Sequence, residues 1–278
     1  MNALKVACVQ MRSGVEIEQN ISDASDLIIE AAQGGAQLIA TPEMTNLIDI
    51  RKGMGRAKAF KEADSPSLAA FRALAEQHSI WLIIGSLAIA QEDGAKLLNR
   101  SYLIAASGAI TARYDKLHMF DVEVGDGQSY RESAGYAAGA HAVLAETEIA
   151  RIGLSICYDL RFAGLYRALA QAGAEILTCP AAFTKVTGEA HWHVLLRARA
   201  IETGAFVLAP AQTGQHEDGR ETFGHSLIIS PWGEIIAERA EDTPGILMAT
   251  LELDQVAAAR KRIPSLRHDR DIDVRTFR

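Results

Sequence analysis

Two segments of the chain end a helix-like run and begin a strand-like run in nearly the same way. They are AQGGAQLIATP at 32–42 and AQAGAEILTCP at 170–180, and five of their eleven paired positions are identical. Strand-like runs at Leu4–Val9 and Arg151–Ile156 precede them, so each segment belongs to a β-α-β unit with parallel strands. The sequence therefore predicts two similar halves. It leaves internal duplication and convergence of short α/β units equally open.

Each unit also defines a helix and a second strand. The helices are expected at 22–33 and 162–171, and the strands at 37–40 and 175–178. Other strand-like runs lie at 81–87, 101–105, 110–114, 205–209, 225–229, 234–237 and 246–251. Strands thus outnumber helices, and two sheets with helices on their outer faces would bury this many apolar strands.

Two further helices are expected at Ser67–His78 and Glu189–Thr203. The second has apolar side chains on a helical period: Trp192, Leu195, Leu196 and Ile201. No low-complexity segment or long linker divides the chain, so residues 1–278 are predicted to form one domain. The charge-rich tail, about 260–278, is expected to extend over the surface or onto a neighbouring subunit.

Composition argues against several classes of protein. The 278 residues carry 28 basic and 35 acidic side chains, and a net charge of −7 is the wrong sign for binding nucleic acid. No stretch reaches the roughly 18 apolar residues of a membrane span, so no membrane association is expected. The opening MNALKVACVQM alternates like a strand and does not resemble a secretory leader. Three well separated cysteines predict reduced thiols and a cytoplasmic protein.

One of these cysteines stands at a strand-to-helix corner, in GLSICYDLRF at 153–162. We interpret Cys8 and Cys179 as small buried apolar side chains. Cys157 differs because backbone N–H groups and the positive end of a helix would lower its pKa and supply donors for an oxyanion. The corner therefore predicts a nucleophilic thiol.

A thiol that attacks an acyl carbon needs a base and a positive group beside it. Glu43 follows Pro42 directly after a strand, and Lys116 stands in YDKLHMF just beyond another. Alone, each would be an ordinary surface residue. Glu43, Lys116 and Cys157 all follow strands, where open α/β sheets place their sites, although spacing alone does not bring them together.

These motifs together resemble the carbon–nitrogen hydrolase (nitrilase) superfamily. The resemblance rests on PE at 42–43, YDKLH at 114–118 and GLSICYDLRF at 153–162, and it covers nearly the whole chain. TGEAHWHVLLRARAIET at 187–203, with GHS and SPWGE after it, is most similar to the branch of deaminated glutathione amidases and ω-amidases.

The resemblance implies an α/β fold, a four-layer α-β-β-α sandwich with two central mixed sheets. It implies a catalytic triad in which Glu43 is the base, Cys157 the nucleophile, and Lys116 with the Tyr158 backbone N–H the oxyanion donor set. The expected reaction is cleavage of the C–N bond of small carboxylate-bearing amides through an acyl thioester. No cofactor is expected, and the chain is expected to form a homo-oligomer, a dimer at least.

The family also implies a second glutamate beside the lysine, which we assign to Glu132, with Glu123 as the competing choice. Two features depart from the family pattern. Thr41 stands where many relatives have an apolar residue, and the loop 121–133 carries no proline. Both departures leave the triad intact and concern the shape of the pocket.

Substrates of the similar amidases carry a carboxylate, which an arginine binds bidentately. Arg161 lies four residues past Cys157 and is the candidate, although it could instead pair with Asp159 or another acid. Phe183 and Thr184 are expected to line the same pocket.

The eight histidines raise the question of metal binding. His191 and His193 stand two apart on a predicted helix and face different sides, so no metal site is expected from them. We keep His118 as a pocket-lining or structural residue.

Two alternative functions stay open. One is another amidase of the same superfamily, such as an N-carbamoyl amino acid hydrolase, because the triad motifs do not separate the branches. The other is a redox-sensing thiol or a non-catalytic binding module. The presence of Glu43 and Lys116 argues against this second class, because thiol redox chemistry needs no carboxylate base.

Overall fold

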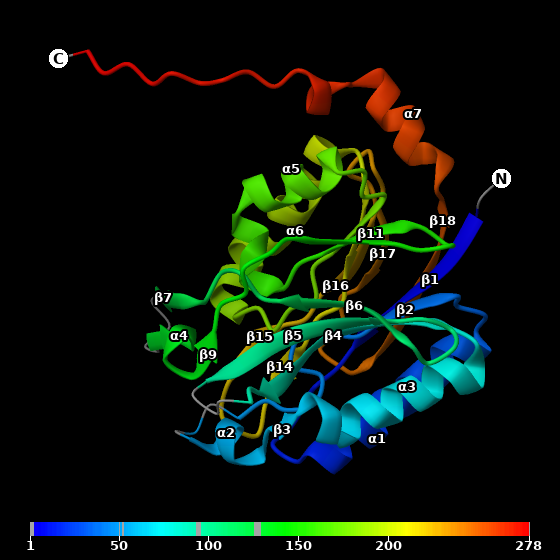
Figure 1. Ribbon diagram of the computed structural model, residues 1–278, viewed down its shortest axis with the longest axis vertical. Helices are drawn as coiled ribbons and strands as arrows, with labels where there is room; N and C mark the ends of the chain where they lie inside the picture. The colour runs from blue at the N-terminus through cyan, green and yellow to red at the C-terminus, as the bar shows by residue number, and fades with distance from the viewer. Residues whose placement is uncertain (1–2, 50, 52, 93–95, 125–128, 278) are drawn as a thin grey trace.

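The computed structural model describes residues 3–49, 51, 53–92, 96–124 and 129–277. Its main elements are two β-sheets that face each other, with helices on both outer sides (Figure 1). The first sheet has the order β18 (Gly245–Glu252), β1 (Ala3–Gln10), β2 (Leu38–Ala40), β4 (Trp81–Ala90), β5 (Leu97–Ile104), β6 (Ile110–Asp115). The second has the order β10 (Val143–Glu146), β11 (Arg151–Leu154), β12 (Ile176–Thr178), β13 (Phe206–Ala209), β16 (Ser226–Ile229), β17 (Ile235–Arg239).

Shorter strands complete the sheets and form two hairpins. β3 (Phe60–Lys61) pairs with β4, β9 (Tyr136–Ala137) pairs with β5, and the hairpins are β7–β8 (Asp121–Glu123, Ser129–Arg131) and β14–β15 (Thr213–Gln215, Glu221–Phe223). The helices are α1 (Ile17–Gln33), α2 (Met54–Lys58), α3 (Pro66–His78), α4 (Glu132–Gly135), α5 (Ala163–Gln171), α6 (Lys185–Thr203) and α7 (Asp254–Arg262). Short 3₁₀ turns lie at Glu62–Asp64 (η1), Cys157–Arg161 (η2) and Ser265–Arg267 (η3).

Alternation along β1 shows how the layers form. Val6 and Cys8 belong to the apolar core between the two sheets, which continues through the second sheet to α5 and α6. Ala7 and Val9 point the other way, into the core that α1 and α3 make with the first sheet. A strand buried on both faces needs a layer on each side. The predicted four-layer α-β-β-α sandwich with two mixed sheets is therefore confirmed.

The two similar sequence segments occupy equivalent places in the two sheets. Each leaves a helix, turns at a glycine and enters a strand that is parallel to both of its neighbours. Gly35 has φ of 85° and Gly173 has φ of 109°, the left-handed region that favours glycine. This geometry explains why that glycine is shared by both segments.

The main differences from the sequence prediction lie at element ends and in short strands. α1 begins at Ile17, five residues before the expected start, and β5 begins at Leu97. β10 and the two hairpins were not expected, because strands of three or four residues leave little periodicity to detect. Ile201 is 54% exposed although it follows the apolar period of α6.

The C-terminal tail begins later than the expected residue 260. α7 continues to Arg262, and Arg260 donates to the Thr203 carbonyl at 3.0 Å. Residues 268–277 are exposed, and beyond Asp269, which pairs with Arg167 of α5, they extend away from the body of the molecule (Figure 1). In the described part of the chain, no helix combines the length and the apolar composition needed to cross a membrane.

Candidate active site

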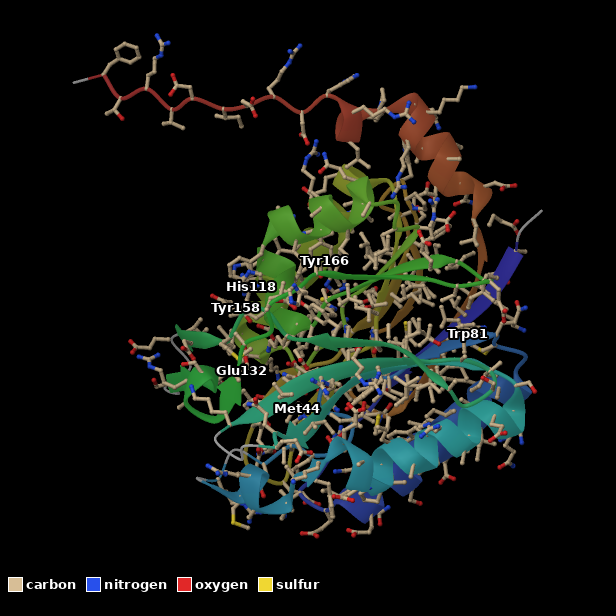
Figure 2. All side chains as sticks on the ribbon, viewed as in Figure 1. Met44, Trp81, His118, Glu132, Tyr158 and Tyr166 are labelled. Atoms are coloured by element: carbon tan, nitrogen blue, oxygen red, sulfur yellow. The ribbon has the colours of Figure 1, made fainter. Side chains whose placement is uncertain are left out.

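Loops from both sheets meet at one end of the sandwich and bring together residues far apart in sequence. Glu43 follows β2, Lys116 follows β6, Cys157 follows β11, and Glu132 begins α4. Figure 2 shows Glu132 toward this end of the molecule and Trp81 at the opposite end. The structure thus gathers the four residues that the sequence assigned to catalysis.

Lys116 is the charged centre of the cluster and is only 2% exposed. Its Nζ lies 2.9 Å from Glu43 Oε1, and 2.8 and 3.0 Å from the two oxygens of Glu132. Burial alone would lower the pKa of this ammonium, but the Glu132 and Glu43 carboxylates outweigh burial and hold the pKa well above the ordinary lysine value. Lys116 is therefore a fixed positive charge in a site closed to bulk water.

Glu43 contacts both the lysine and the thiol. Its Oε1 accepts from Lys116 and from Asn99 Nδ2 at 2.8 Å, and its Oε2 accepts from the Ala182 backbone N–H at 2.8 Å. Burial would raise the pKa of this carboxyl, but the Lys116 charge and hydrogen bonds from Lys116, Cys157 and Ala182 lower it below the usual range. Glu43 is consequently ionised at neutral pH and accepts a hydrogen bond from the Cys157 thiol.

Cys157 is buried at the start of the 3₁₀ turn η2, with φ of 48°. Its N–H donates to the Pro180 carbonyl at 2.9 Å, which helps hold a backbone conformation that non-glycine residues rarely adopt. Burial and the Glu43 carboxylate raise the pKa of the thiol well above its ordinary value, and Lys116 offsets them only in part. The sequence-based expectation of a lowered pKa is wrong, because burial and a neighbouring carboxylate outweigh the positive groups at the corner.

A buried aspartate holds this corner in shape. Asp159 Oδ2 accepts from the Ile156 N–H at 2.9 Å and from the Tyr114 hydroxyl at 2.6 Å. Asp159 Oδ1 lies 2.7 Å from His118 Nδ1, and the His118 ring stacks on Phe162 with 3.4 Å between centroids. The structure therefore places His118 with Asp159 and Phe162 at the edge of the corner, in a supporting position.

The two candidate glutamates of the 121–133 loop differ sharply. Glu132 contacts Lys116 and accepts from the Phe120 N–H at 2.7 Å. The Glu123 side chain is 74% exposed and pairs with Arg131 at 3.1 Å. Only Glu132 of the two therefore shares the lysine with Glu43. Residues 125–128 of this loop, which the sequence marked for its lack of proline, lie outside the described residues.

Thr41, the other departure from the family pattern, supports the loop that carries Glu43. Its hydroxyl accepts from the Gly85 N–H at 3.1 Å and lies 2.8 Å from the Thr45 hydroxyl. A Cβ on Gly85 would lie 2.1 Å from the Thr41 carbonyl oxygen and 2.5 Å from Pro180 Cβ. Only glycine lets the loops after β2 and β12 approach this closely.

The residues predicted to bind substrate lie around the thiol corner. The Arg161 guanidinium sits 5.4 Å from the centre of the Phe183 ring and 6.0 Å from that of Tyr158. It lies 3.3 Å from His191 Nδ1, and no ion pair joins it to an acid within the described ranges. The alternative in which Arg161 pairs with Asp159 is therefore wrong.

Thr184 precedes the first turn of α6, and its hydroxyl lies 2.7 Å from that of Thr187. The Tyr158 ring packs edge-on against Phe120 and Phe162, at 5.1 and 5.4 Å. Thr184 thus has a hydroxyl partner already, whereas Tyr158 and Phe183 form an aromatic wall beside Arg161.

Sequence reasoning missed Asn99, whose Nδ2 donates to both Glu43 and Glu132, the latter at 3.1 Å. It also missed the Ala182 N–H on Glu43, which has no side-chain signal. The signal for Asn99 was a polar residue inside an otherwise apolar run, LLNRSYLI. Such a residue, buried on a central strand, needs polar partners at hand.

This arrangement suits acyl transfer. One carboxylate contacts both an ammonium and a neutral thiol, and the cluster is shielded from water. The carboxylate can take the thiol proton, and the ammonium can stabilise an oxyanion.

Comparisons with known proteins agree with this chemistry. Residues 5–261 match the carbon–nitrogen hydrolase family. A deaminated glutathione amidase of Yersinia enterocolitica is 40% identical over 272 residues, 97% of this chain and 94% of that protein. The human deaminated glutathione amidase is 37% identical over 95% of this chain and 82% of its own length.

Solved structures give the same result. The NitFhit protein of C. elegans superposes with a TM-score of 0.90 at 36% identity, over 96% of this chain and 65% of that longer one. Nit3 of Saccharomyces cerevisiae, a member of branch 10 of the nitrilase superfamily, superposes with a TM-score of 0.85 at 26% identity, over 94% of both chains. This chain belongs to the carbon–nitrogen hydrolase family and is a hydrolase of C–N bonds other than peptide bonds.

Proposed function

We propose that this chain is a cysteine-dependent amidase that cleaves deaminated glutathione and related ω-amides of dicarboxylates. The observation that carries the chemistry is the Glu43 carboxylate, which is hydrogen-bonded to both the Lys116 ammonium and the Cys157 thiol. The substrate class is supported by relatives named deaminated glutathione amidase, which are 35–41% identical over almost the whole chain.

The first half of the reaction forms a thioester. Cys157 Sγ attacks the amide carbon while Glu43 takes the thiol proton, so that a raised thiol pKa is no obstacle. The oxyanion that forms is stabilised by Lys116 and by the Tyr158 backbone N–H. Glu43 then passes its proton to the leaving nitrogen, the C–N bond breaks, and an amine or ammonia departs.

The second half hydrolyses the thioester. Glu43, ionised again, takes a proton from a water molecule whose oxygen attacks the acyl carbon. The C–S bond breaks, the proton returns to sulfur, and the carboxylic acid leaves. Glu132 and Asn99 hold Lys116 and Glu43 in place throughout, because Glu132 accepts from Lys116 while Asn99 donates to Glu43 and to Glu132.

The end of the substrate away from the scissile amide is assigned to Arg161. Its guanidinium has aromatic rings beside it and no acid paired with it among the described residues, so its donors are available to an α-keto carboxylate. Phe183 and Tyr158 flank this group, and the Thr184 hydroxyl, shared with Thr187, is a second donor. Removing the bidentate geometry with Arg161→Lys is expected to cost about 1.5–3 kcal/mol in kcat/KM.

The test compares release of product from matched amides. Wild-type protein is expected to hydrolyse deaminated glutathione and α-ketoglutaramate, and a neutral amide of the same length poorly. Arg161→Lys should lose activity on the charged amides alone, and Arg167→Lys, at an arginine that pairs with Asp269 in the tail, is the matched control. Faster hydrolysis of N-carbamoyl amino acids, or equal losses on charged and neutral amides, would contradict the substrate assignment.

We also propose that residues 1–278 form one domain with an extended tail, and that two chains pair through α5, α6 and this tail. Exposed apolar side chains support the pairing, three on α6 and three in the tail: Val186, Val194, Ile201, Ile272, Val274 and Phe277. Light scattering at micromolar concentration is expected to give at least twice the 30.0 kDa of one chain. A 30 kDa species would rule the dimer out.

A cytoplasmic location is part of the same proposal. Cys8, Cys157 and Cys179 are free thiols, and catalysis by Cys157 needs a compartment that keeps thiols reduced. Fractionation of cells that express the full chain is the test. Activity found with an extracytoplasmic fraction would contradict it.

A further inference from the structure

Two histidines and a glutamate meet outside the active site, where α6 packs against the second sheet. His193 lies on α6, His225 directly precedes β16, and Glu238 lies on β17. His193 Nε2 is 2.9 Å and His225 Nδ1 is 2.7 Å from the same atom, Glu238 Oε1. Three side chains from three elements thus present their donor atoms to one point.

The cluster is rigid on its inner side and open on its outer side. The Phe223 ring stacks on His225 at 4.3 Å and packs edge-on against His193 at 6.0 Å. Trp192 Nε1 donates to the His225 carbonyl at 2.8 Å, which ties the backbone of His225 to α6. The three side chains stay 27–31% exposed, so a small ion and a water molecule can reach them.

We propose that His193, His225 and Glu238 form a binding site for a divalent transition-metal ion of the Zn²⁺ type. Their three donor atoms lie within 4.8 Å of one another. A tetrahedral ion with bonds of about 2.0–2.1 Å sets neighbouring donor atoms roughly 3.3 Å apart. The two contacts with Glu238 need to open by about half an ångström, and the two histidine nitrogens, which lie within 4.8 Å of each other, need to reach the same separation, with water as the fourth ligand.

The donor set selects the class of ion. Two imidazole nitrogens and one carboxylate oxygen suit Zn²⁺, Co²⁺, Ni²⁺ or Cu²⁺, whereas Mg²⁺ and Ca²⁺ prefer oxygen ligands alone. The ion binds an unprotonated nitrogen of each imidazole, so a ring proton that faces Glu238 moves to the other ring nitrogen, or to water where the ring is protonated. The bound ion joins α6 to β16 and β17. The site lies outside the Glu43–Lys116–Cys157 cluster and is independent of the proposed hydrolysis.

Sequence spacing could not reveal this site. Spacing along one helix pairs His193 only with His191, two positions away, and those two side chains face different sides. The partners of His193 are instead 32 and 45 residues further along the chain, just before β16 and on β17.

Co²⁺ is the probe of choice, because its visible bands distinguish nitrogen and oxygen ligands from a thiolate. We expect the Cys157→Ala protein, stripped of metal with a chelator, to bind one equivalent of Co²⁺ per chain without a thiolate charge-transfer band. Glu238→Gln and His193→Ala, each in that background, should weaken Co²⁺ binding by at least 10- to 100-fold, on the order of what outer-shell changes alone cost. His191→Ala, on the same helix, should stay within about twofold of the parent protein.

Thermal unfolding with and without Zn²⁺ provides the second readout. Zn²⁺ should raise the unfolding midpoint of the Cys157→Ala protein and of His191→Ala, but not that of Glu238→Gln. The metal-free midpoint shows whether each variant is folded. Equal Co²⁺ affinity in all the variants, or Co²⁺ binding that disappears with Cys157→Ala, would overturn the proposal.

Discussion

The two halves of the molecule share a strand order and divide the chemistry between them. In the first sheet β1, β2 and β4 run parallel, and β5 and β6 continue antiparallel. In the second, β11, β12 and β13 run parallel, and β16 and β17 continue antiparallel. Each sheet adds one antiparallel strand at its other edge, β18 or β10. Equivalent loops therefore emerge at equivalent places.

What differs is the side chains these loops carry. After β2 the chain reads Thr41-Pro42-Glu43, and after β12 it reads Cys179-Pro180-Ala181. Ala181 thus stands in the second half where Glu43 stands in the first. The residue after it, Ala182, donates its backbone N–H to the Glu43 carboxylate. The first half supplies the charges and the second the thiol. Neither half contains the site alone, so packing of the two sheets assembles it.

The largest expected effect separates the two cysteines of the second half. Cys157→Ala is expected to lower kcat by more than about 10⁴-fold, because the nucleophile is removed. Cys179→Ala, at a buried thiol without a carboxylate base, is expected to keep most of the activity and lose stability only. Mass spectrometry of protein quenched during turnover should find the acyl adduct on Cys157. An adduct on Cys179 or Cys8 would reverse the assignment.

Substitutions of the charged residues in the first half should also lower kcat strongly, but less than Cys157→Ala does. Glu43→Gln removes the proton acceptor and Lys116→Gln the positive charge, and each is expected to lower kcat by about 10²-fold or more. Steady-state kinetics with a saturating amide is the measurement, and the thermal unfolding midpoint shows that each variant is folded. A near wild-type kcat in either variant would remove that residue from the mechanism.

Glu132 and Glu123 offer a matched pair within one loop. Glu132→Gln leaves Lys116 with one carboxylate, so we expect a 10- to 100-fold loss of kcat, on the order of other supporting-shell changes. Glu123→Gln, at an exposed residue, is expected to change kcat by less than about twofold. The two variants are to be measured side by side. If Glu123→Gln were the more damaging, the loop would hold the lysine differently during turnover.

The pH profile tests which group takes the thiol proton. The pKa of Glu43 is lowered by its partners, so its carboxylate persists at pH values below the ordinary glutamate pKa of about 4.3. Its stabilising effect on the fold is present above the unfolded pKa and is lost as pH falls through the folded one. We therefore expect kcat/KM to stay nearly flat from pH 5 to 8, roughly the range between ordinary glutamate and thiol pKa values.

His118 as the base would give a different curve. An imidazole base stops working once it is protonated, so kcat/KM would show an acid limb between roughly pH 5 and 8. Buffers of constant ionic strength, with controls for unfolding at the acidic end, make the comparison clean. An acid limb in that range that disappears in His118→Asn would assign the role of base to His118 in place of Glu43.

The sequence predicted the layers and the grouping of Glu43, Lys116 and Cys157 for different reasons. Strand and helix periodicity indicates which faces are apolar, and two sheets with helices outside follow from that pattern. Periodicity does not indicate that Glu43, Lys116 and Cys157 lie together. That prediction came from the resemblance to a family. Neither source could give the raised thiol pKa, because it depends on burial and on one carboxylate 114 positions away in the chain.

The smallest expected effect concerns Thr41, which matches Cys179 in the other half. Its buried hydroxyl accepts from the Gly85 N–H at 3.1 Å and meets Thr45 at 2.8 Å, whereas the Cys179 sulfur lies 3.9 Å from the Cys157 carbonyl. Thr41→Val keeps the shape but leaves the Gly85 N–H without a partner, and we expect a loss of about 1–3 kcal/mol in the free energy of unfolding. Thr41→Ser keeps the hydroxyl and should retain more of that stability.

Because Glu43 is also held by Lys116, Asn99 and Ala182, kcat should change by less than about threefold in either variant. Urea unfolding with kinetics on the same samples measures both. A large loss of kcat in Thr41→Val would show that the loop after β2, unlike the loop after β12, needs its polar side chain to position the base.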